Sequence, residues 1–363
     1  MSIPAREGRY DLSVFVGRFQ PFHNGHLHIV REALAQAERL LIVVGSAGAA
    51  RRPDLVPFTA QERREMITAS LTEAERRRVL FALVPDYSDL SVWTQAVEAE
   101  ASSAVAGDPG ARVTLIGCSK DRSSYYLRAF PQWDAIAVAP QLDALSATPL
   151  RAAYFDADPA VAEAFLGDGA QRILPPTVVD WLTRFRAQPV YADLVEEWTF
   201  AGRYRAAWAA APYPPTFVTA DAVVIRGGEV LLIRRKGWPG RGLWALPGGF
   251  VEQDEFVIEA AIRELAEETA LEVDADVLRA NLVATHVYDA PFRDIRGRVI
   301  SHAALFRLPD AAGAAPQVTA ADDAAAARWT PLAQVRREAM FGDHFQIIRA
   351  FAALIGEHGL EEQ

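Results

Sequence analysis

Short runs of apolar and β-branched residues recur along the first half of the chain, with room for a helix between most of them. The runs are Leu12–Val16, Leu40–Val44, Val79–Val84, Val113–Ile116 and Ala135–Ala139. Helical periodicity follows the first run, at Leu27, Val30, Leu34 and Ala37. Alternating strands and helices predict a parallel sheet with right-handed crossovers, whose ligands bind at the carboxyl ends of the strands.

The pattern changes between residues 187 and 215. Aromatic and charged residues mix in Tyr191–Trp198, and the breaker run Ala211–Pro215 follows. Proline fixes φ and biases the residue before it away from helix. We therefore expect a helical connector and a proline-rich linker at 187–215, between a first domain at 1–186 and a second domain at 216–363.

The second half predicts a mixed α/β domain. Ala222–Ile225 and Val230–Ile233 are separated by a glycine turn, which is typical of a hairpin. Further strands are expected at Asn281–Val287 and Ile300–Leu308, and helices at Glu255–Glu268 and Gln346–Ile355. The alanine-rich stretch Ala311–Ala327 is expected to be a surface loop.

Composition narrows the class of protein. The chain has 363 residues, enough for two domains, and a formal net charge of -10, which argues against a nucleic-acid binder. The single cysteine, Cys118, excludes an intramolecular disulfide and favours a reducing compartment. Because no signal peptide or membrane-length apolar run is apparent, we expect a cytoplasmic protein with no membrane partner. The sequence leaves a homo-oligomer open.

Three of the seven histidines, His23, His26 and His28, lie within six residues, in a turn that enters the first helix. Unpaired N–H groups and the dipole at a helix start attract anions, and Gly25 allows a close approach of the ligand. With Arg18 as a planar cation, His23 and His26 predict a phosphate site. Zinc is disfavoured because a third ligand at matching spacing is not apparent, and His28 is expected to face solvent or to pack.

The stretch Gly17–His26 resembles the HxGH signature of the nucleotidyltransferase superfamily, and most closely that of archaeal-type nicotinamide mononucleotide (NMN) adenylyltransferases. The second signature of that superfamily is similar to Ser146–Arg151, and Pro57–Arg63 and Ile116–Tyr126 also match the branch. The resemblance covers about the first 185 residues. It implies a Rossmann-like parallel-sheet domain that transfers AMP from ATP to NMN, giving NAD and pyrophosphate.

The resemblance also implies site residues. His23 and His26 would contact the ATP phosphates and stabilise the transition state, and Arg18 and Arg151 would hold the phosphate chain, which Mg²⁺ bridges. Supporting substrate contacts are expected from Gly17, Phe19, Gly25, Lys120, Ser146 and Thr148. For NMN, Trp93 would stack on the cationic ring and Asp86 or Tyr87 would contact the nucleotide. Alternatively, Trp93 is an interior packing residue.

A second chemical pattern lies in the predicted helix Glu255–Glu268. Glu264, Glu267 and Glu268 fall at i, i+3 and i+4, so a helix gathers their carboxylates on one side. Oxygen ligands alone favour a hard cation, Mg²⁺ or Mn²⁺. The alternative is a solvated acidic face, which is the usual role of a charge run.

The spacing of this stretch is that of the Nudix box, with Gly249, Glu255 and Arg263 at their family positions. This resemblance implies that the three glutamates bind metal, that Glu267 and Glu268 are catalytic, that Arg263 orients glutamates by pairing with Glu255, and that Glu252 adds a metal or substrate contact. Ala270 departs from the family, which usually has a helix-ending glycine there. An alanine in a left-handed conformation costs on the order of 1 kcal/mol or more.

Two further stretches, Phe292–Ser301 and Phe341–His344, resemble the ADP-ribose pyrophosphatase subgroup, so the implied products are AMP and ribose 5-phosphate. Nearly the whole chain is thus similar to bifunctional enzymes that join an NMN adenylyltransferase to a Nudix hydrolase. One alternative keeps the fold but changes the phosphorylated acceptor and the nucleoside diphosphate. In another, the second domain is a non-catalytic sensor of ADP-ribose.

Overall fold

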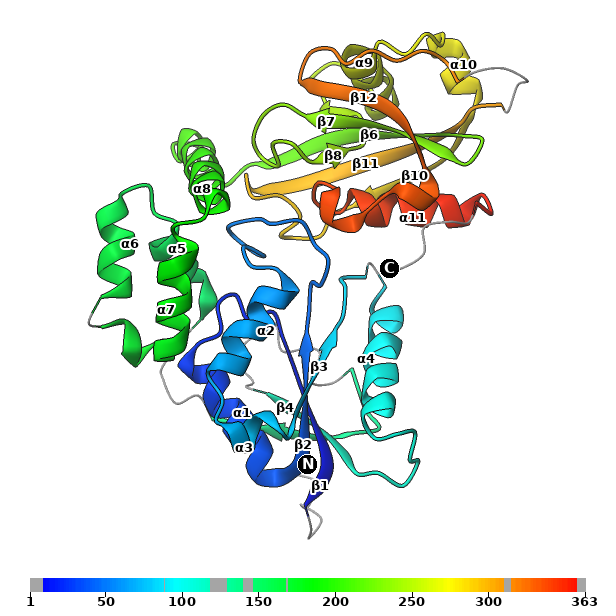
Figure 1. Cartoon of the computed structure of the whole chain (residues 1–363). Coiled ribbons are helices and arrows are strands. Elements are labelled where there is room, and N and C mark those ends of the chain that lie inside the picture. Colours follow the sequence, from blue (N-terminus) through cyan, green and yellow to red (C-terminus); the bar gives the residue numbers. More distant parts are fainter. Residues whose placement is uncertain are drawn as a thin grey trace. The chain divides into compact units, whose positions relative to one another are not determined.

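The computed structural model describes residues 9–87, 89–117, 129–139, 146–167, 169–309 and 315–357. The chain divides into an N-terminal unit, Met1–Val195, and a C-terminal unit, Glu196–Gln363. Figure 1 labels their elements. Within the described ranges, no helix combines the length and the hydropathy needed to cross a lipid bilayer.

A five-stranded parallel sheet forms the centre of the N-terminal unit, in the order β3-β2-β1-β4-β5. Its strands are β1 (Tyr10–Gly17), β2 (Ala37–Val44), β3 (Val79–Leu83), β4 (Val113–Gly117) and β5 (Asp134–Ala137). Each predicted apolar run forms one of these strands, so the prediction of a Rossmann-like parallel sheet is confirmed. Gly17 ends β1 in the middle of the sheet, which brings the residues after it to the carboxyl edge.

Helices cover both faces of this sheet. Helix α1 (Asn24–Gln36) and helix α2 (Ala60–Ala69) lie on one face, and α4 (Leu90–Ala104) packs on the other (Figure 1). Helix α1 buries the predicted stripe, except that Ala37 ends the helix as its C-cap and begins β2. The remaining helices are α3 (Glu73–Arg76), α5 (Ala147–Tyr154), α6 (Pro159–Leu166), the 3-10 turn η2 (Ala170–Arg172) and α7 (Pro176–Phe185).

The C-terminal unit is built on a mixed seven-stranded sheet, with the main order β10-β11-β6-β7-β12. The strands are β6 (Thr216–Arg226), β7 (Glu229–Arg235), β8 (Trp244–Ala245), β9 (Gly248–Phe250), β10 (Leu282–Tyr288), β11 (Arg298–Arg307) and β12 (Ala324–Pro331). Strands β6 and β7 form the predicted hairpin, whereas β6 and β11 run parallel. The predicted mixed architecture is confirmed.

Strand β12 corrects one prediction. We expected Ala311–Ala327 to be a surface loop, but Ala324 already pairs with Arg235 as the first residue of β12. The four alanines at its start give no alternation between apolar and polar positions. Pairing with β7 therefore determines this strand, and local sequence does not.

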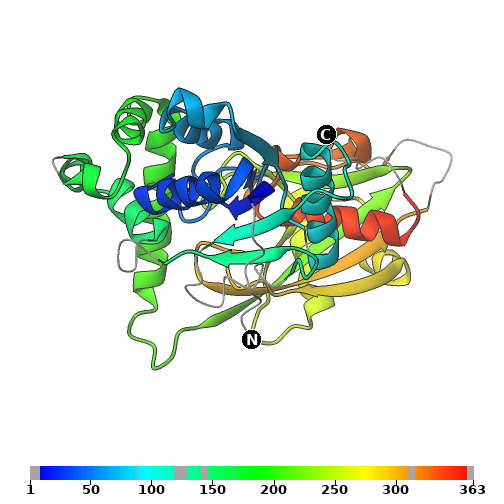
Figure 2. The ribbon, with the colours of Figure 1, turned by 90° about the horizontal axis from the view of Figure 1, so that it is seen from below.

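Helices α9 (Val257–Thr269) and α11 (His344–Leu354) pack on opposite faces of the mixed sheet. Figure 2 shows α11, in red, lying along the strands. Both helices were predicted, within two residues at each end. The shorter elements are α10 (Ala275–Ala280) and the 3-10 turns η3 (Leu332–Gln334) and η4 (Arg337–Ala339).

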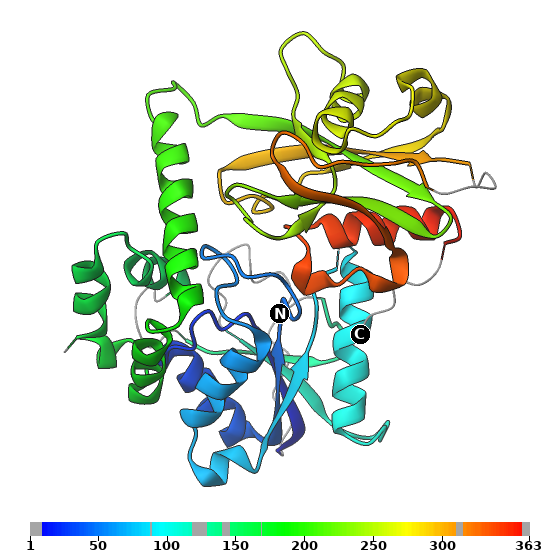
Figure 3. The same cartoon turned by 45° about the horizontal axis from the view of Figure 1, so that its top comes forward.

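The predicted helical connector contains α8 (Pro189–Ala207), one continuous helix seen in full length in Figure 3. The division between the two units falls inside it, after Val195. Residues from Glu196 onward therefore belong to the C-terminal unit. The exact domain limits 1–186 and 216–363 stay a prediction.

Candidate active sites

His23 and His26 begin helix α1 with a reciprocal pair of hydrogen bonds. His23 is the N-cap, and its Nδ1 accepts from the backbone N–H of His26, while Nδ1 of His26 accepts from the N–H of His23, each at 3.3 Å. The two rings stack with 3.5 Å between their centroids. The histidines thus satisfy helix N–H groups in the way that Ser and Glu do in a capping box.

When the two rings are neutral, this arrangement sets which nitrogen carries the proton. A neutral imidazole whose Nδ1 accepts a hydrogen bond has its proton on Nε2, so Nε2–H is the donor of both rings. His23 is buried and His26 half-buried, so the rings are held by their surroundings. Two ordered N–H donors at a helix start suit a phosphate ligand. His28 is partly exposed on the same helix.

Arginine side chains gather around this turn. Arg18 is exposed, whereas Arg63 and Arg151 are buried. The pKa of Arg151 is lowered to about 10, mainly by burial and then by the neighbouring charge of Arg18. Burial is also the largest cause for Arg63, whose pKa is lowered to about 10. The charge of Asp86 opposes this shift, and the charge of Arg18 adds to it. Both groups remain cationic at neutral pH, so three positive charges lie near the two histidines.

Arg151 differs from the expectation that it reaches toward phosphates. Its Nε donates to the carbonyl of Asp54 at 2.9 Å and its Nη1 to the carbonyl of Gln20 at 2.9 Å. Its Nη2 donates to Thr148 Oγ1 at 3.3 Å, which leaves Thr148 as a partner of the arginine. A buried cation has lost its hydrating water, so hydrogen bonds to backbone carbonyls stabilise it. Through these bonds Arg151 connects α5 to the histidine turn. Ser146 is the exposed N-cap residue of α5.

Phe19 also differs from its predicted role. Its ring is 1% exposed and packs on Phe15 and His26, so a substrate contact with this side chain is excluded in this conformation. The ring lies over Gly17, where a Cβ atom would come within 2.7 Å of it, which explains the glycine. Gly25, half-buried, is the second residue of α1.

Two of the stretches that resemble the nucleotidyltransferases interlock. Gln20 follows Phe19, and its side-chain amide donates to the carbonyl of Phe58 at 2.9 Å and accepts from the N–H of Phe58 at 3.0 Å. The segment Pro57–Arg63 thereby supports the segment Gly17–His26. Sequence reasoning named both segments but gave no sign that they contact each other.

The predicted NMN residues follow β3. Asp86 is exposed and accepts a hydrogen bond from Ser46 Oγ at 3.0 Å. Tyr87 and Trp93 are half-buried and pack against the core between α4 and the sheet, and the ring of Trp93 lies 5.7 Å from that of Phe130. Part of the Trp93 ring therefore packs against the core, as the alternative interpretation expected. Its stacking on a ligand stays a prediction. Lys120 and Cys118 lie outside the described residues.

In the C-terminal unit, Arg263 pairs with two carboxylates of α9 and with one that precedes this helix. Its guanidinium pairs with Glu255 at 2.7 Å, as predicted, and also with Glu264 at 2.8 Å and Glu267 at 2.9 Å. Glu252 is exposed, and its N–H donates to Glu255 at 2.8 Å. One cation thus orients three carboxylates, since a guanidinium offers several donors in one plane.

Two glycines let the loop before α9 approach the carboxylates. A Cβ at Gly249 would lie 2.4 Å from Oε1 of Glu264, and one at Gly248 would lie 2.4 Å from the carbonyl of Ala220. The N–H of Gly248 donates to Glu268 at 2.9 Å. Burial, above all, raises the pKa of Glu268 to about 8, and burial also raises the pKa of Glu264.

These residues fit a hard divalent cation in chemistry, because every side-chain donor is a carboxylate oxygen and two of the groups are costly to ionise without a counter-charge. Their positions differ from the predicted cluster. Across the described ranges, no three His, Cys, Asp or Glu side chains converge as metal ligands. Glu264 and Glu267 lie against Arg263, whereas Glu268 accepts from the N–H of Gly248, and their role as metal ligands stays a prediction.

Ala270 ends α9 in the left-handed conformation, with φ 43° and ψ 37°. Its N–H donates to the carbonyl of Ala266 at 2.9 Å. The helix end that glycine usually makes in the family is therefore made here by an alanine, at the position where the sequence departs from the family.

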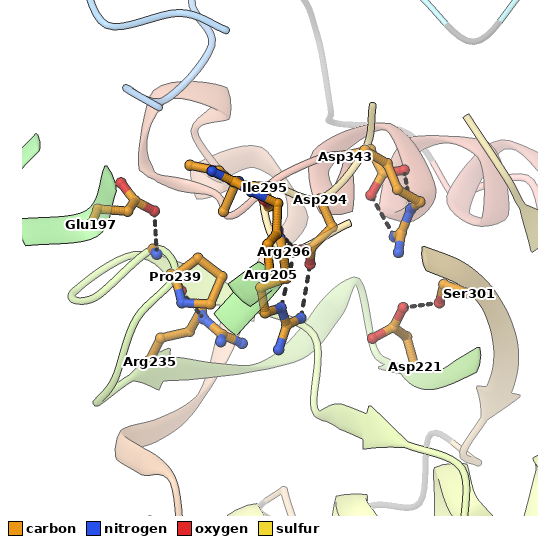
Figure 4. Close-up of polar contacts among 12 residues, drawn as sticks. Glu197, Arg205, Asp221, Arg235, Pro239, Asp294, Ile295, Arg296, Ser301 and Asp343 are labelled. Atoms are coloured by element: carbon orange, nitrogen blue, oxygen red, sulfur yellow. Dashed lines mark hydrogen bonds and ion pairs between the residues drawn. The ribbon is translucent and has the colours of Figure 1, made fainter. Parts of the chain in front are cut away.

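The two stretches that resemble ADP-ribose pyrophosphatases meet in the structure. Arg293 pairs with Asp343 at 2.7 and 3.0 Å, which joins Phe292–Ser301 to Phe341–His344 (Figure 4). Asp294 pairs with Arg296 at 2.8 Å, and Ser301 donates to the buried carboxylate of Asp221. His344 Nδ1 accepts from the N–H of Leu246 at 2.9 Å, two residues before Gly248. The two stretches thus hold each other and the loop that carries the glycines.

Sequence reasoning missed the contribution of α8 to this unit. Glu197, 3% exposed, accepts from the N–H of Gly240 at 2.9 Å, and Arg205 donates to the carbonyl of Ile295 at 2.6 Å (Figure 4). Arg235 donates to the carbonyl of Pro239 at 2.7 Å in the same loop. A long helix before a linker gave no sequence signal that its second half supports these loops.

Comparison with known proteins identifies both halves. A NUDIX domain model matches residues 215–351, and a cytidylyltransferase-like model matches residues 14–84. The chain is 32% identical to the nicotinamide/nicotinic acid mononucleotide adenylyltransferase of Acinetobacter baylyi, over 52% of this chain and 94% of that protein. It is 38% identical to the ADP-ribose pyrophosphatase of Methanocaldococcus jannaschii, over 37% of this chain and 72% of that protein.

A solved structure matches both units of this chain. It is a bifunctional NMN adenylyltransferase/ADP-ribose pyrophosphatase from Francisella tularensis, complexed with AMP and a manganese ion. The identity is 34%, the TM-score is 0.85, and the match covers 95% of this chain and 99% of that one. This chain therefore belongs to the family of bifunctional NMN adenylyltransferase/ADP-ribose pyrophosphatases.

Proposed function

We propose that the chain synthesises NAD from ATP and NMN in its N-terminal unit and hydrolyses ADP-ribose in its C-terminal unit. The observation that carries the proposal is the match along 95% of the chain to a protein named for both activities. Domain limits of 1–186 and 216–363, a cytoplasmic location and the oligomeric state remain predictions.

In the first reaction, a 5'-phosphate oxygen of NMN attacks the α-phosphorus of ATP, the bond to the β-phosphate breaks, and pyrophosphate leaves. His23 and His26 donate through Nε2–H to phosphate oxygens whose charge grows in the transition state. Arg18 and the buried cations below the turn compensate the approach of two anions. Mg²⁺ enters as the partner of ATP, and positioning supplies much of the rate.

Asp86 and Trp93 are the proposed contacts for NMN. Both follow β3, whose carboxyl end lies at the same edge of the sheet as the histidine turn. A carboxylate and an aromatic ring both favour a cationic pyridinium. A panel of phosphorylated acceptors tests this choice, and rapid use of another acceptor with no NAD formed from NMN would replace it.

In the second reaction, a water molecule attacks one phosphorus of the diphosphate, and the products are AMP and ribose 5-phosphate. Glu264, Glu267 and Glu268 would hold a divalent cation, for which we propose Mg²⁺ with Mn²⁺ as a substitute. A bound cation supplies charge compensation and lowers the pKa of water. Arg263 and Glu255 orient the carboxylates, and Glu252 lies at the entrance to the helix.

The decisive experiment measures both activities in one preparation, by chromatography of NAD and of AMP. We expect Mg²⁺-dependent activity in each assay. If ADP-ribose binds but is not hydrolysed with either metal, the C-terminal unit is a sensor. If another nucleoside diphosphate is cleaved much faster, the substrate assignment is wrong while the reaction class stands.

A further inference from the structure

The N-terminal unit contains a completely buried arginine that the proposed mechanism does not use directly. Arg63, on α2, is 0% exposed and is the largest of the fully buried side chains. Over the part of the chain that the structure describes, no carboxylate forms an ion pair with it. A buried cation without such a partner is costly, so its hydrogen bonds should be informative.

Among the described residues, the side chain of Arg63 makes four hydrogen bonds, and each goes to a backbone carbonyl. One is in its own helix turn, from Nε to Thr59 at 3.2 Å. The other three lie beyond the ends of β1 and β2, where Nη1 donates to Arg18 at 2.9 Å and Gly45 at 2.6 Å, and Nη2 donates to Ser46 at 3.3 Å. A single side chain therefore joins the two loops at the carboxyl edge of the central strands.

Each of these loops contains a strained residue directly after a carbonyl that Arg63 holds. Phe19 follows Arg18 with φ 52°, and Ser46 follows Gly45 with φ 51°. Neither is glycine, and a bulky aromatic residue is rare in this left-handed region. Such strain persists only where the surroundings enforce it, and it is common at functional sites.

The hydrogen bonds also orient the peptide groups. In a planar trans peptide, the N–H points opposite to the carbonyl of the preceding residue. With the carbonyls of Arg18 and Gly45 turned toward Arg63, the N–H groups of Phe19 and Ser46 point away from it. Ser46 Oγ donates to Asp86, so the same loop also reaches a predicted NMN contact.

We propose that Arg63 is a positioning residue for the polyphosphate of ATP. It holds the loops Gly17–Phe19 and Gly45–Ser46 in a strained shape that presents backbone N–H groups and the Arg18 side chain to the phosphates, and its buried charge adds positive potential from below. The inference rests on the proposed adenylyltransferase site, but it concerns ATP binding and not catalysis with NMN.

The test compares MgATP binding by calorimetry in the full-length wild type, Arg63→Lys, Arg63→Met and Arg64→Met. Arg64 is the matched control, because it is exposed on the same helix and carries the same charge. Lysine keeps the charge but offers one ammonium to three separated carbonyls. We expect Kd for MgATP to rise about tenfold in Arg63→Lys and further in Arg63→Met, and to stay within twofold in Arg64→Met.

A merely structural role predicts a different result. Misfolded molecules lower the binding stoichiometry, whereas the folded remainder keeps the wild-type Kd, and that outcome would overturn the proposal. So would failure of both Arg63 variants to fold, or a wild type that does not bind MgATP. If the wild type binds MgATP but makes no NAD from NMN, the proposed function fails while the role of Arg63 is still decided by the variants.

Discussion

The two candidate sites act on the same chemical group, the phosphoric anhydride, with opposite charges. The histidine turn combines two imidazoles with the exposed Arg18, and the buried cations Arg63 and Arg151 hold backbone carbonyls of that turn and of neighbouring loops. Helix α9 instead presents carboxylates, which repel a diphosphate unless a cation lies between them. The charges of the first site thus complement the anionic substrate itself. The charges of the second site complement a metal ion, which in turn would bind the diphosphate.

The largest expected effect comes from removing an imidazole donor. His26→Asn keeps an acceptor at the place of Nδ1, and so the helix cap, but lacks Nε2–H. We expect NAD synthesis to fall about 10²- to 10³-fold, the usual cost of a lost donor to a developing charge. Thermal unfolding should stay close to wild type, whereas His26→Ala should also lose about 1 kcal/mol of helix-cap stability.

Hydrolysis of ADP-ribose by the same His26→Asn preparation should equal that of the wild type. If instead both activities fall together, the substitution acts on the whole chain, and the contrast between the sites does not hold for this residue.

The corresponding change in the second site is Glu267→Gln, which removes one negative charge and leaves the shape. Because metal-supplied charge compensation is worth several kcal/mol, we expect hydrolysis to fall about 100-fold or more while NAD synthesis continues. Glu259→Gln is the control, since Glu259 lies on the same helix but pairs with Arg279. Equal losses in the two variants would argue for a general effect on α9.

Arg263→Lys sharpens the comparison between the two sites, because the cation at position 263 pairs with carboxylates, whereas the cations of the first site are proposed to act on phosphates. A single ammonium cannot reach Glu255, Glu264 and Glu267 together, so the carboxylates should be less well oriented. We expect hydrolysis and apparent metal affinity to fall about 10- to 100-fold, as for other supports of metal ligands. Titrating activity against Mg²⁺ measures both. Unchanged metal dependence would limit Arg263 to a structural role.

The smallest effect is expected from Ala270→Gly. The left-handed backbone there favours glycine, so the C-terminal unit should gain about 1 kcal/mol, which raises its Tm by ~2–4 °C in a domain of this size. Hydrolysis should stay within twofold, because no carboxylate moves. A lower Tm would mean that the Cβ of Ala270 makes a favourable contact that outweighs the strain.

Sequence predicted the strands and helices with strong periodicity, and the motifs pointed to the turn before α1 and to α9, where the site residues stay a prediction. It did not predict what the charged residues do. Arg151 was expected to hold the phosphate chain, and Arg63 was named only as the last residue of a matching stretch, yet both side chains are buried among backbone carbonyls. Burial depends on loops more than 30 residues away, such as those at Arg18 and Gln20, which pattern reasoning does not bring together.

The same limit explains the histidines and β12. The spacing of His23 and His26 indicated a phosphate site, but the reciprocal cap that sets their tautomer requires the helix to begin at Asn24. Strand β12 starts with alanines, whose side chains carry little information about faces, and β7 supplies the missing constraint. The type of site was thus easier to predict from the sequence than the hydrogen bonds and strand pairings that position its residues.

Helix α8 has a practical consequence for taking the two enzymes apart. Tyr191 in its first half donates to the carbonyl of Tyr154 at 2.7 Å, and Arg205 in its second half donates to Ile295 at 2.6 Å. A recombinant hydrolase that began at residue 215, where the NUDIX match starts, would lack Glu197 and Arg205. An adenylyltransferase fragment and a hydrolase fragment both need part of this helix, so dissection is better done by inactivating point substitutions than by cutting the gene.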